Sequence, residues 1–254
     1  MSTAPAAVDA PRNTYEGLSE LRVDLAACYR MAARLGMHEG ICNHLSVMLP
    51  GRRDRFLINP RDRHWSRITA SKLLVIDEHG ATVEGDGEPL RTGPTIHIRI
   101  HLEHPRAQVV FHTHMPYATA LACAEGGRLL PVHQNATRFL DECAYDDTFS
   151  GLAFDMDEGA RMARMMDGKR ILFLRHHGVI VVAHSVAEAF DDLYYLERAC
   201  QVQVMAASIG RAALMPVEVA RHTAEQFRER KASAQRHFAE IKAMLDEAEP
   251  QYAH

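Results

Sequence analysis

The stretch VVFHTHMPYA, Val109 to Ala118, carries two histidines, one residue apart, at the end of an apolar run. Side chains two residues apart on a β-strand point to the same face, so we expect His112 and His114 to project together from a strand end. An isolated pair of this kind is more often structural than metal-binding. The stretch ILFLRHHG, Ile171 to Gly178, also ends an apolar run in histidines and changes that balance.

This second stretch supplies a third candidate metal ligand beside His112 and His114. His177 abuts Gly178, where we expect the backbone to bend, and we take His177 as the ligand and His176 as its neighbour. Three neutral imidazoles bind a divalent ion at about 2.0 to 2.1 Å and leave a position open for water or substrate, as in catalytic sites. The sequence therefore predicts one divalent ion per chain on His112, His114 and His177. Zinc is the first choice, with manganese, cobalt or iron as alternatives.

Composition favours one globular unit. The chain has 254 residues, of which 47% are apolar, enough for a single core. We expect a flexible leader over residues 1–14 and one domain over 15–254 that ends in a helical segment. The net charge of −4 argues against binding to nucleic acid or to an anionic membrane surface. The sequence shows neither a signal peptide nor a membrane-spanning run, so we expect a cytoplasmic protein.

Hydrophobic periodicity predicts an α/β domain whose helices alternate with a sheet of hairpins and meanders. Ser185 and Glu188 form a capping box at the start of one long helix. Helices are expected over residues 18–35, 95–103, 115–125, 157–168 and 185–210, and after residue 216. Strands are expected over residues 44–50, 55–60, 71–77, 81–85, 107–114 and 128–132, and on both sides of a bend at Gly178 within 169–183.

Taken in order, several motifs resemble the class II aldolase/adducin family. They are NHLSV (43–47), FLINP (56–60), ITASKLLVID (68–77), HPRAQVVFHTH (104–114), HHGVIVVAHSVAEAF (176–190) and LERACQ (196–201). The resemblance covers about residues 18 to 202. It implies a three-layer α/β/α fold with a mainly antiparallel central sheet and a divalent Lewis acid on His112, His114 and His177. It also implies a homotetramer with active sites at subunit interfaces.

The sequence departs from the sugar-phosphate aldolases of this family. Their SSE triplet, whose Glu is a catalytic acid/base, falls here on Arg91, Thr92 and Gly93, so that carboxylate is missing. Their phosphate-binding residues are also replaced, which argues against a phosphorylated sugar. We predict that Arg91, with Thr92 and Asn43, binds a substrate carboxylate, because a guanidinium pairs with a carboxylate through two hydrogen bonds. Arg61 is a further candidate for this role. The alternative is that the arginines are solvated surface residues.

Other residues are candidates for the proton transfer that the missing Glu would have performed. His44 lies in NHLS, His133 in PVHQN, and Tyr252 in the C-terminal PQY. Histidine titrates near neutral pH, and tyrosine can act as an acid. Each of the three is also a plausible structural residue. His97 ranks lower, because a histidine on a helix face often serves packing.

Three enzymatic functions and one non-catalytic function follow from the resemblance. The favoured function is a metal-dependent carbon-carbon lyase that cleaves a small, non-phosphorylated hydroxy- or oxo-carboxylate by a retro-aldol reaction. A decarboxylase of a hydroxylated aromatic or oxo acid is the main alternative, because it needs no base to replace the missing Glu; an epimerase ranks third. A non-catalytic scaffold like adducin would tolerate loss of the metal ligands, whereas all three ligands are present here.

Overall fold

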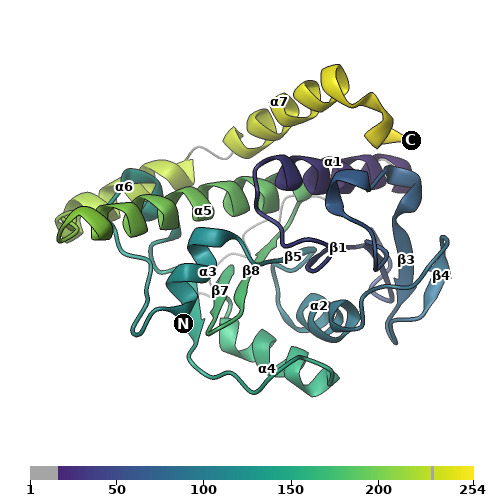
Figure 1. The fold of residues 1–254 in the computed structure, drawn as a ribbon, viewed down its shortest axis with the longest axis horizontal. Helices are drawn as coiled ribbons and strands as arrows, with labels where there is room; N and C mark the ends of the chain where they lie inside the picture. Colours follow the sequence, from purple (N-terminus) through teal and green to yellow (C-terminus); the bar gives the residue numbers. More distant parts are fainter. Residues whose placement is uncertain (1–16, 230–231) are drawn as a thin grey trace, which may run out of the picture.

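A computed structural model describes residues 17–229 and 232–254 (Figure 1). The predicted leader, residues 1–14, lies outside the described residues. The helices are α1 Leu18–Arg34, α2 Thr92–Glu103, α3 Pro116–Cys123, α4 Met156–Met166, α5 Val186–Ile209, α6 Val217–Glu229 and α7 Ser233–Ala248, with short 3₁₀ turns η1 Trp65–Arg67, η2 Ala70–Lys72, η3 Gln134–Phe139 and η4 Pro250–Ala253. The strands are β1 His44–Met48, β2 Arg55–Ile58, β3 Leu74–Asp77, β4 Thr82–Glu84, β5 Val109–Thr113, β6 Cys143–Asp146, β7 Ile171–Leu174 and β8 Gly178–Ala183.

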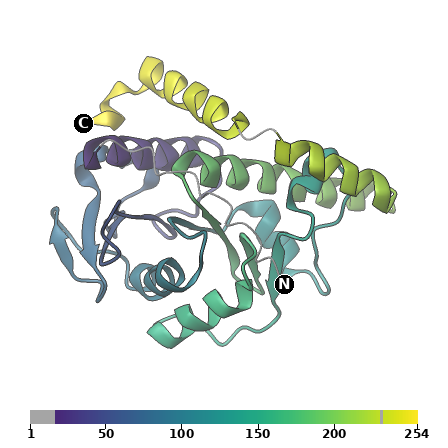
Figure 2. The same ribbon diagram turned by 180° about the vertical axis from the view of Figure 1, so that it is seen from behind.

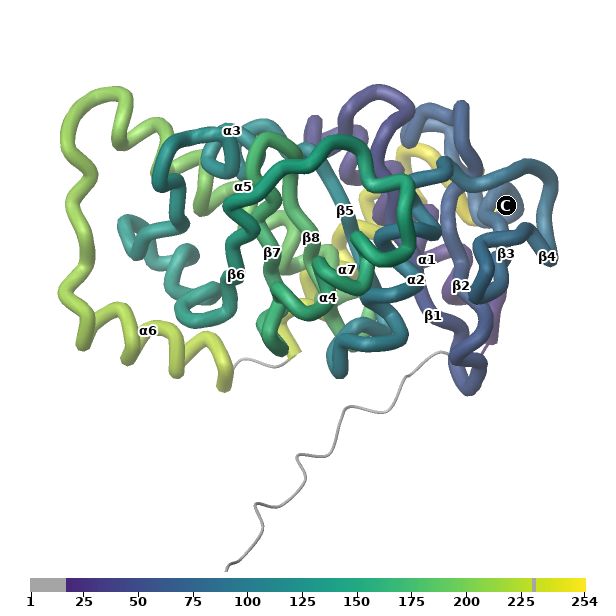
Figure 3. Tube along the Cα trace, turned by 90° about the horizontal axis from the view of Figure 1, so that it is seen from below, coloured from purple at the N-terminus to yellow at the C-terminus, as the bar shows by residue number. Residues whose placement is uncertain are grey.

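The strands form one eight-stranded sheet in the order β4-β3-β2-β1-β5-β8-β7-β6, and Figure 3 shows them in this succession. Neighbouring strands are antiparallel, except that β6 and β7 run parallel. The predicted α/β class and the mainly antiparallel sheet are confirmed, and the sheet is mixed.

Helices cover both faces of the sheet. On one face lie α1, α3 and α5, and α7 packs on the outside of α1 and α5 (Figures 1 and 2). On the other face lie α2 and α4, which approach closely, since a Cβ at Gly159 of α4 would come within 2.2 Å of the Thr95 carbonyl of α2. Among the described residues, no helix combines the length and apolar character needed to span a membrane.

Helix α2 has three faces that pack differently against the sheet. Ile96 and Ile100 join an apolar cluster under β5, β7 and β8, and Ile98 joins a second cluster under β1, β2 and β3. Between these clusters His97 and His101 are buried, with 1% and 2% of their surface exposed. A strip of polar side chains therefore divides the core on this side of the sheet.

Three local features differ from the predictions. Residues 128–132 form no strand, because the N–H groups of Leu129 and Leu130 donate to side chains of β6 and α5 and Pro131 has no N–H. Strand β6 was missed, since its sequence CAYD lacks a sustained apolar pattern. The turn between β7 and β8 lies at residues 175–177, directly before the predicted bend at Gly178, and its left-handed residue is His176, with φ 56°. The predicted cap of α5 is confirmed: the Ser185 hydroxyl accepts a hydrogen bond from the Glu188 N–H.

The segment after the two histidines of β5 is fixed by a buried carboxylate. Glu197 of α5 is 3% exposed and accepts hydrogen bonds of 2.9 Å from the N–H groups of Tyr117 and Ala118. These are N–H groups of the first turn of α3, which lack partners within the helix. Glu197 therefore ties the start of α3, two residues beyond His114, to the long helix α5.

We expect Glu197→Ala to lower the free energy of unfolding by roughly 1–3 kcal/mol, because two buried N–H groups lose their acceptor. Urea unfolding followed by circular dichroism measures this change. The control is Glu225→Ala on the exposed side of α6, for which we expect a change within about 0.5 kcal/mol. Equal stabilities of the two variants would contradict the assignment.

Candidate metal centre

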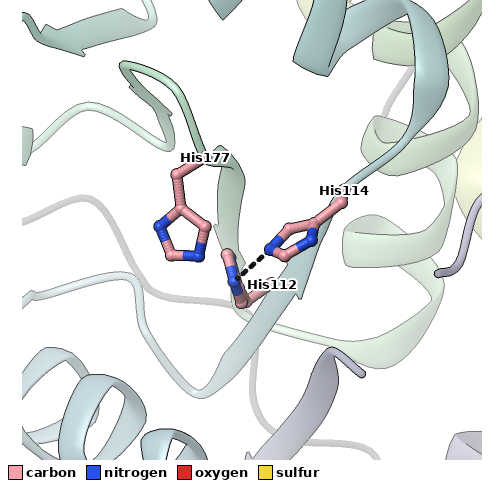
Figure 4. Close-up of side chains that lie close together, drawn as sticks. All are labelled: His112, His114 and His177. Carbon is pink, nitrogen blue, oxygen red and sulfur yellow. Dashed lines mark hydrogen bonds between the residues drawn. The ribbon is translucent and has the colours of Figure 1, made fainter. Parts of the chain in front are cut away.

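The three predicted ligands come together at one end of the sheet. His112 lies on β5, His114 follows the end of that strand, and His177 lies in the turn before β8. One ligand atom of each residue lies within 4.8 Å of those of the other two. Figure 4 shows the three imidazoles facing a common point from these two segments.

The pairing of β5 with β8 brings the two segments together. Thr113 pairs with Val179 in antiparallel register, so the end of β5 meets the start of β8. A Cβ at Gly178 would lie 2.5 Å from the Thr113 carbonyl oxygen and 2.7 Å from Cδ2 of His114. Only glycine therefore allows the turn that carries His177 to approach the other two ligands this closely.

Hydrogen bonds orient two of the rings for metal binding. His112 donates from Nδ1 to the Val179 carbonyl at 3.1 Å, and Nδ1 of His114 lies 2.5 Å from a carboxylate oxygen of Glu39. Both partners are acceptors, so both Nδ1 atoms carry a proton, and in the neutral rings that bind a metal ion both Nε2 atoms present a lone pair. A carboxylate or carbonyl behind a ligating histidine is the usual arrangement at metal sites.

The distance between the two Nε2 atoms fits a shared metal ion. They lie 3.3 Å apart (Figure 4). Two ligands at about 2.05 Å from one ion, at the tetrahedral angle, lie about 3.3 Å apart. Two lone pairs facing each other at this distance repel unless a cation lies between them, so the donor set fits a divalent ion.

Two of the three ligands, His112 and His177, are uncharged at neutral pH. Burial, and next the charge of neighbouring His114, lowers the pKa of His177 to about 4. Burial lowers the pKa of His112 well below its usual value. Neutral imidazole is the form that binds a metal ion, so no proton has to be displaced from these two rings at pH 7.

The cluster opens on one side into a pocket. This pocket has a volume of about 640 Å³, and its lining includes His114, His177, Thr119, Phe149 and Leu152. Phe149 and Leu152 are exposed residues of the segment between β6 and α4. A small molecule in this pocket would have access to the open side of the histidine cluster.

His44 lies beside the cluster and takes the space next to Gly93. It is the direct cross-strand partner of His112, and the centroids of the two rings are 5.1 Å apart. A Cβ at Gly93 would meet the His44 ring at 3.4 Å and Ile58 at 3.0 Å. A Cβ at position 93 would therefore touch the His44 ring and require the end of the Ile58 side chain to shift slightly. His44 is the polar side chain that faces this position.

Two of the residues predicted to bind the substrate, Thr92 and Asn43, also lie at the metal centre. The Thr92 hydroxyl is 3.1 Å from Nε2 of His44. Asn43, in a left-handed conformation with φ 73°, accepts a hydrogen bond from the His114 N–H through its side-chain oxygen. Its amide nitrogen is buried and has no partner among the described residues.

Other predicted residues are not brought to the cluster. The exposed guanidinium of Arg91 lies over the Phe154 ring at 4.9 Å and lines a different pocket, and Arg61 pairs with Glu88 on the surface. The polar side chains next to the three metal-ligand histidines are therefore those around His44, and Arg91 is not among them.

Two predicted proton-transfer residues also lie elsewhere in the chain. Tyr252 is 1% exposed, packs in the core beneath α7, and donates its hydroxyl to Asp246 at 2.9 Å. His133 precedes η3, which packs against α5 and α6. Burial raises the pKa of Tyr252 well above its usual value, so the hydroxyl keeps its proton.

Sequence reasoning missed Glu39, Ser46 and His101. Glu39 is 75 residues from His114, with which it interacts, and it lies in no recognisable motif. His101 follows His97 by one helical turn, and this spacing was the available signal that α2 presents two histidines on one face.

Comparison with known proteins agrees with the fold. Residues 23–204 match the family model described as Class II Aldolase and Adducin N-terminal domain. A Caulobacter vibrioides protein named as an aldolase class 2 protein is 38% identical over 195 residues, which are 76% of this chain and 74% of that protein. The protein named decarboxylase NovR, from Streptomyces niveus, is 32% identical over 217 residues, which are 84% of this chain and 80% of that protein.

A solved structure extends the likeness to nearly the whole chain. The crystal structure of an aldolase II superfamily protein from Pseudomonas syringae superposes with a TM-score of 0.88 at 31% identity, covering 95% of this chain and 98% of that one. The chain therefore belongs to the class II aldolase and adducin family, as its motifs predicted.

We expect Glu39→Gln to weaken zinc binding by roughly tenfold to a hundredfold, because the carboxylate that orients His114 and increases its basicity is lost. Competition with a chromophoric chelator measures the affinity. The control is Glu20→Gln, an exposed residue of α1, which should bind zinc like the unaltered protein. Equal affinities for all three proteins would contradict a supporting role for Glu39.

Proposed function

We propose that the protein is a metal-dependent carbon-carbon lyase that cleaves a small, non-phosphorylated carboxylate by a retro-aldol reaction. The observation that carries the proposal is the pair of Nε2 atoms of His112 and His114, 3.3 Å apart, with both Nδ1 atoms already bonded. A divalent ion held there and by His177 would act as a Lewis acid toward substrate oxygen atoms.

His44 and Thr92 are the groups proposed to move the proton. In retro-aldol cleavage the hydroxyl of the substrate loses its proton, the adjacent carbon-carbon bond breaks, and its electron pair remains on the other fragment. The Thr92 hydroxyl lies 3.1 Å from Nε2 of the buried His44, so it can pass its own proton to His44 while it accepts the substrate's.

The environment of His44 keeps the ring neutral and makes its protonated form short-lived. Burial, followed by the charges of His114 and His177, lowers the pKa of His44 to about 3. The ring is therefore neutral at pH 7 with a free lone pair, and although it is a weak base, its protonated form is a strong acid that gives the proton up readily. It would return the proton to the carbon fragment, which balances the reaction, since retro-aldol cleavage neither consumes nor releases protons overall.

The substrate class follows from the pocket. The family's phosphate-binding residues are absent from this chain, and the pocket lining at Phe149 and Leu152 is apolar. A short oxo- or hydroxy-acid could place its oxygen atoms toward the three histidines and its remaining carbon atoms against these side chains. We therefore favour a carboxylate without a phosphate group.

Decarboxylation is the second candidate. It is supported by the similarity to the protein named decarboxylase NovR and by Gly93 at the position of the family's catalytic Glu. In that reaction carbon dioxide leaves with cleavage of a carbon-carbon bond, and the remaining fragment takes up one proton. The two reactions therefore differ in their products and in proton consumption.

We expect the zinc- or manganese-loaded protein to convert a 4-hydroxy-2-oxo acid into an aldehyde and pyruvate in equal amounts. A panel of such acids and of dihydroxybenzoic acids would be assayed for aldehyde, pyruvate and carbon dioxide. His112→Ala should bind little metal and lack activity, whereas His222→Ala, on the exposed side of α6, should keep both. Carbon dioxide without aldehyde would instead support the decarboxylase, and a protein that binds no metal would support an adducin-like scaffold.

We expect His44→Gln to lower kcat by roughly 10²- to 10⁴-fold while metal content stays unchanged, because an amide cannot take up the proton. Steady-state kinetics and metal analysis of the same preparation measure both. His79→Gln, whose side chain is 82% exposed, serves as the control. A His44→Gln enzyme as fast as this control would remove His44 from the reaction.

A further inference from the structure

We propose that a buried chain of hydrogen bonds holds His44 in one tautomer, with a proton on Nδ1 and a lone pair on Nε2. His97, Ser46 and His101 form this chain and are positioning residues for His44. Its catalytic consequence rests on the proposed function, whereas the tautomers themselves do not.

The chain of hydrogen bonds runs between the sheet and α2. Nδ1 of His44 is 2.8 Å from Nε2 of His97, and Nδ1 of His97 is 2.5 Å from the Ser46 hydroxyl. The hydroxyl is 2.7 Å from Nε2 of His101, whose Nδ1 is 2.6 Å from the Ala107 carbonyl oxygen. All four side chains of the chain are at most 2% exposed.

The far end of the chain fixes its direction. A backbone carbonyl oxygen can only accept a hydrogen bond, so Nδ1 of His101 must carry a proton. Burial lowers the pKa of His101 to about 4, so the ring is neutral and its Nε2 has a lone pair. The Ser46 hydroxyl must therefore donate to His101.

The same reasoning continues toward the metal centre. Because Ser46 uses its only proton on His101, it accepts from Nδ1 of His97. The neutral His97 then has a lone pair on Nε2, which accepts from Nδ1 of His44. His44 in turn presents an unprotonated Nε2, and the Thr92 hydroxyl is placed to donate to it.

The alternative arrangements are unfavourable. If Ser46 donated to the Val110 carbonyl, 3.4 Å away, His101 would need protons on both nitrogens, and a buried cation would result. If His44 carried its proton on Nε2, its Nδ1 lone pair would face the lone pair of His97 at 2.8 Å. One pattern therefore satisfies every group in the chain.

With this pattern, the role of the hydrogen-bond chain is to orient His44. It ends on a carbonyl group that neither releases nor takes up a proton, so it cannot conduct protons to solvent at that end. It instead keeps the His44 ring from rotating and prevents the other tautomer. A histidine held in the wrong tautomer loses most of its capacity as a base, as the Ser-His-Asp triad illustrates.

The first test is direct detection of the tautomers. In protein labelled with ¹⁵N-histidine, long-range ¹H–¹⁵N correlation spectra distinguish Nδ1–H from Nε2–H rings, and single substitutions identify each signal. We expect His44, His97 and His101 to be neutral Nδ1–H tautomers at pH 7. An Nε2–H ring at His44 or His101 would overturn the proposal, whether or not the protein is a lyase.

The second test interrupts the chain at its hydroxyl. Ser46→Ala should let His44 populate both tautomers and lower kcat by at least about tenfold, with metal content and KM unchanged. Ser46→Thr keeps the hydroxyl and should restore both the tautomer and the rate. Unchanged kcat in Ser46→Ala would refute the positioning role. Should the unaltered enzyme show no lyase activity, the proposed function fails, and the spectra still decide the tautomers.

Discussion

The antiparallel pairing of β5 with β8 is the constraint on which the site depends. It places the turn that carries His177 against the end of β5, and it works only because Gly178 has no side chain to strike the Thr113 carbonyl. The same pairing supplies the Val179 carbonyl that accepts a hydrogen bond from His112. For His112, position and tautomer therefore have one structural origin, whereas the tautomer of His114 depends on Glu39.

The opposite neighbour of β5 adds the polar part of the site. Because His44 of β1 pairs directly with His112, both side chains point toward α2, where His97 and His101 complete the polar strip between two apolar clusters. Buried polar groups are costly unless each is hydrogen-bonded, and in this strip each has a partner. The strip is thus compatible with a stable core and restricts how the rings can rotate.

Much of this arrangement could be predicted from the sequence because it follows from local rules. Strand periodicity placed His112 and His114 on one side, and the HHG turn supplied His177. Glu39 and Ser46 could not be found in this way, because their contacts join segments 51 to 75 residues apart that only the folded sheet brings together. Strand β6 was missed for the same reason: its stability comes from parallel pairing with β7 rather than from its own sequence pattern.

The pocket is built from two parts of different character. The histidines lie at the ends of central strands, whereas Phe149 and Leu152 belong to an exposed segment that follows the edge strand β6. Substitutions in that segment can reshape the cavity without disturbing the strands that hold the imidazoles. Within this architecture, selectivity for the organic molecule and retention of the reactive centre can evolve separately, so one scaffold can acquire new substrates while its chemistry stays the same.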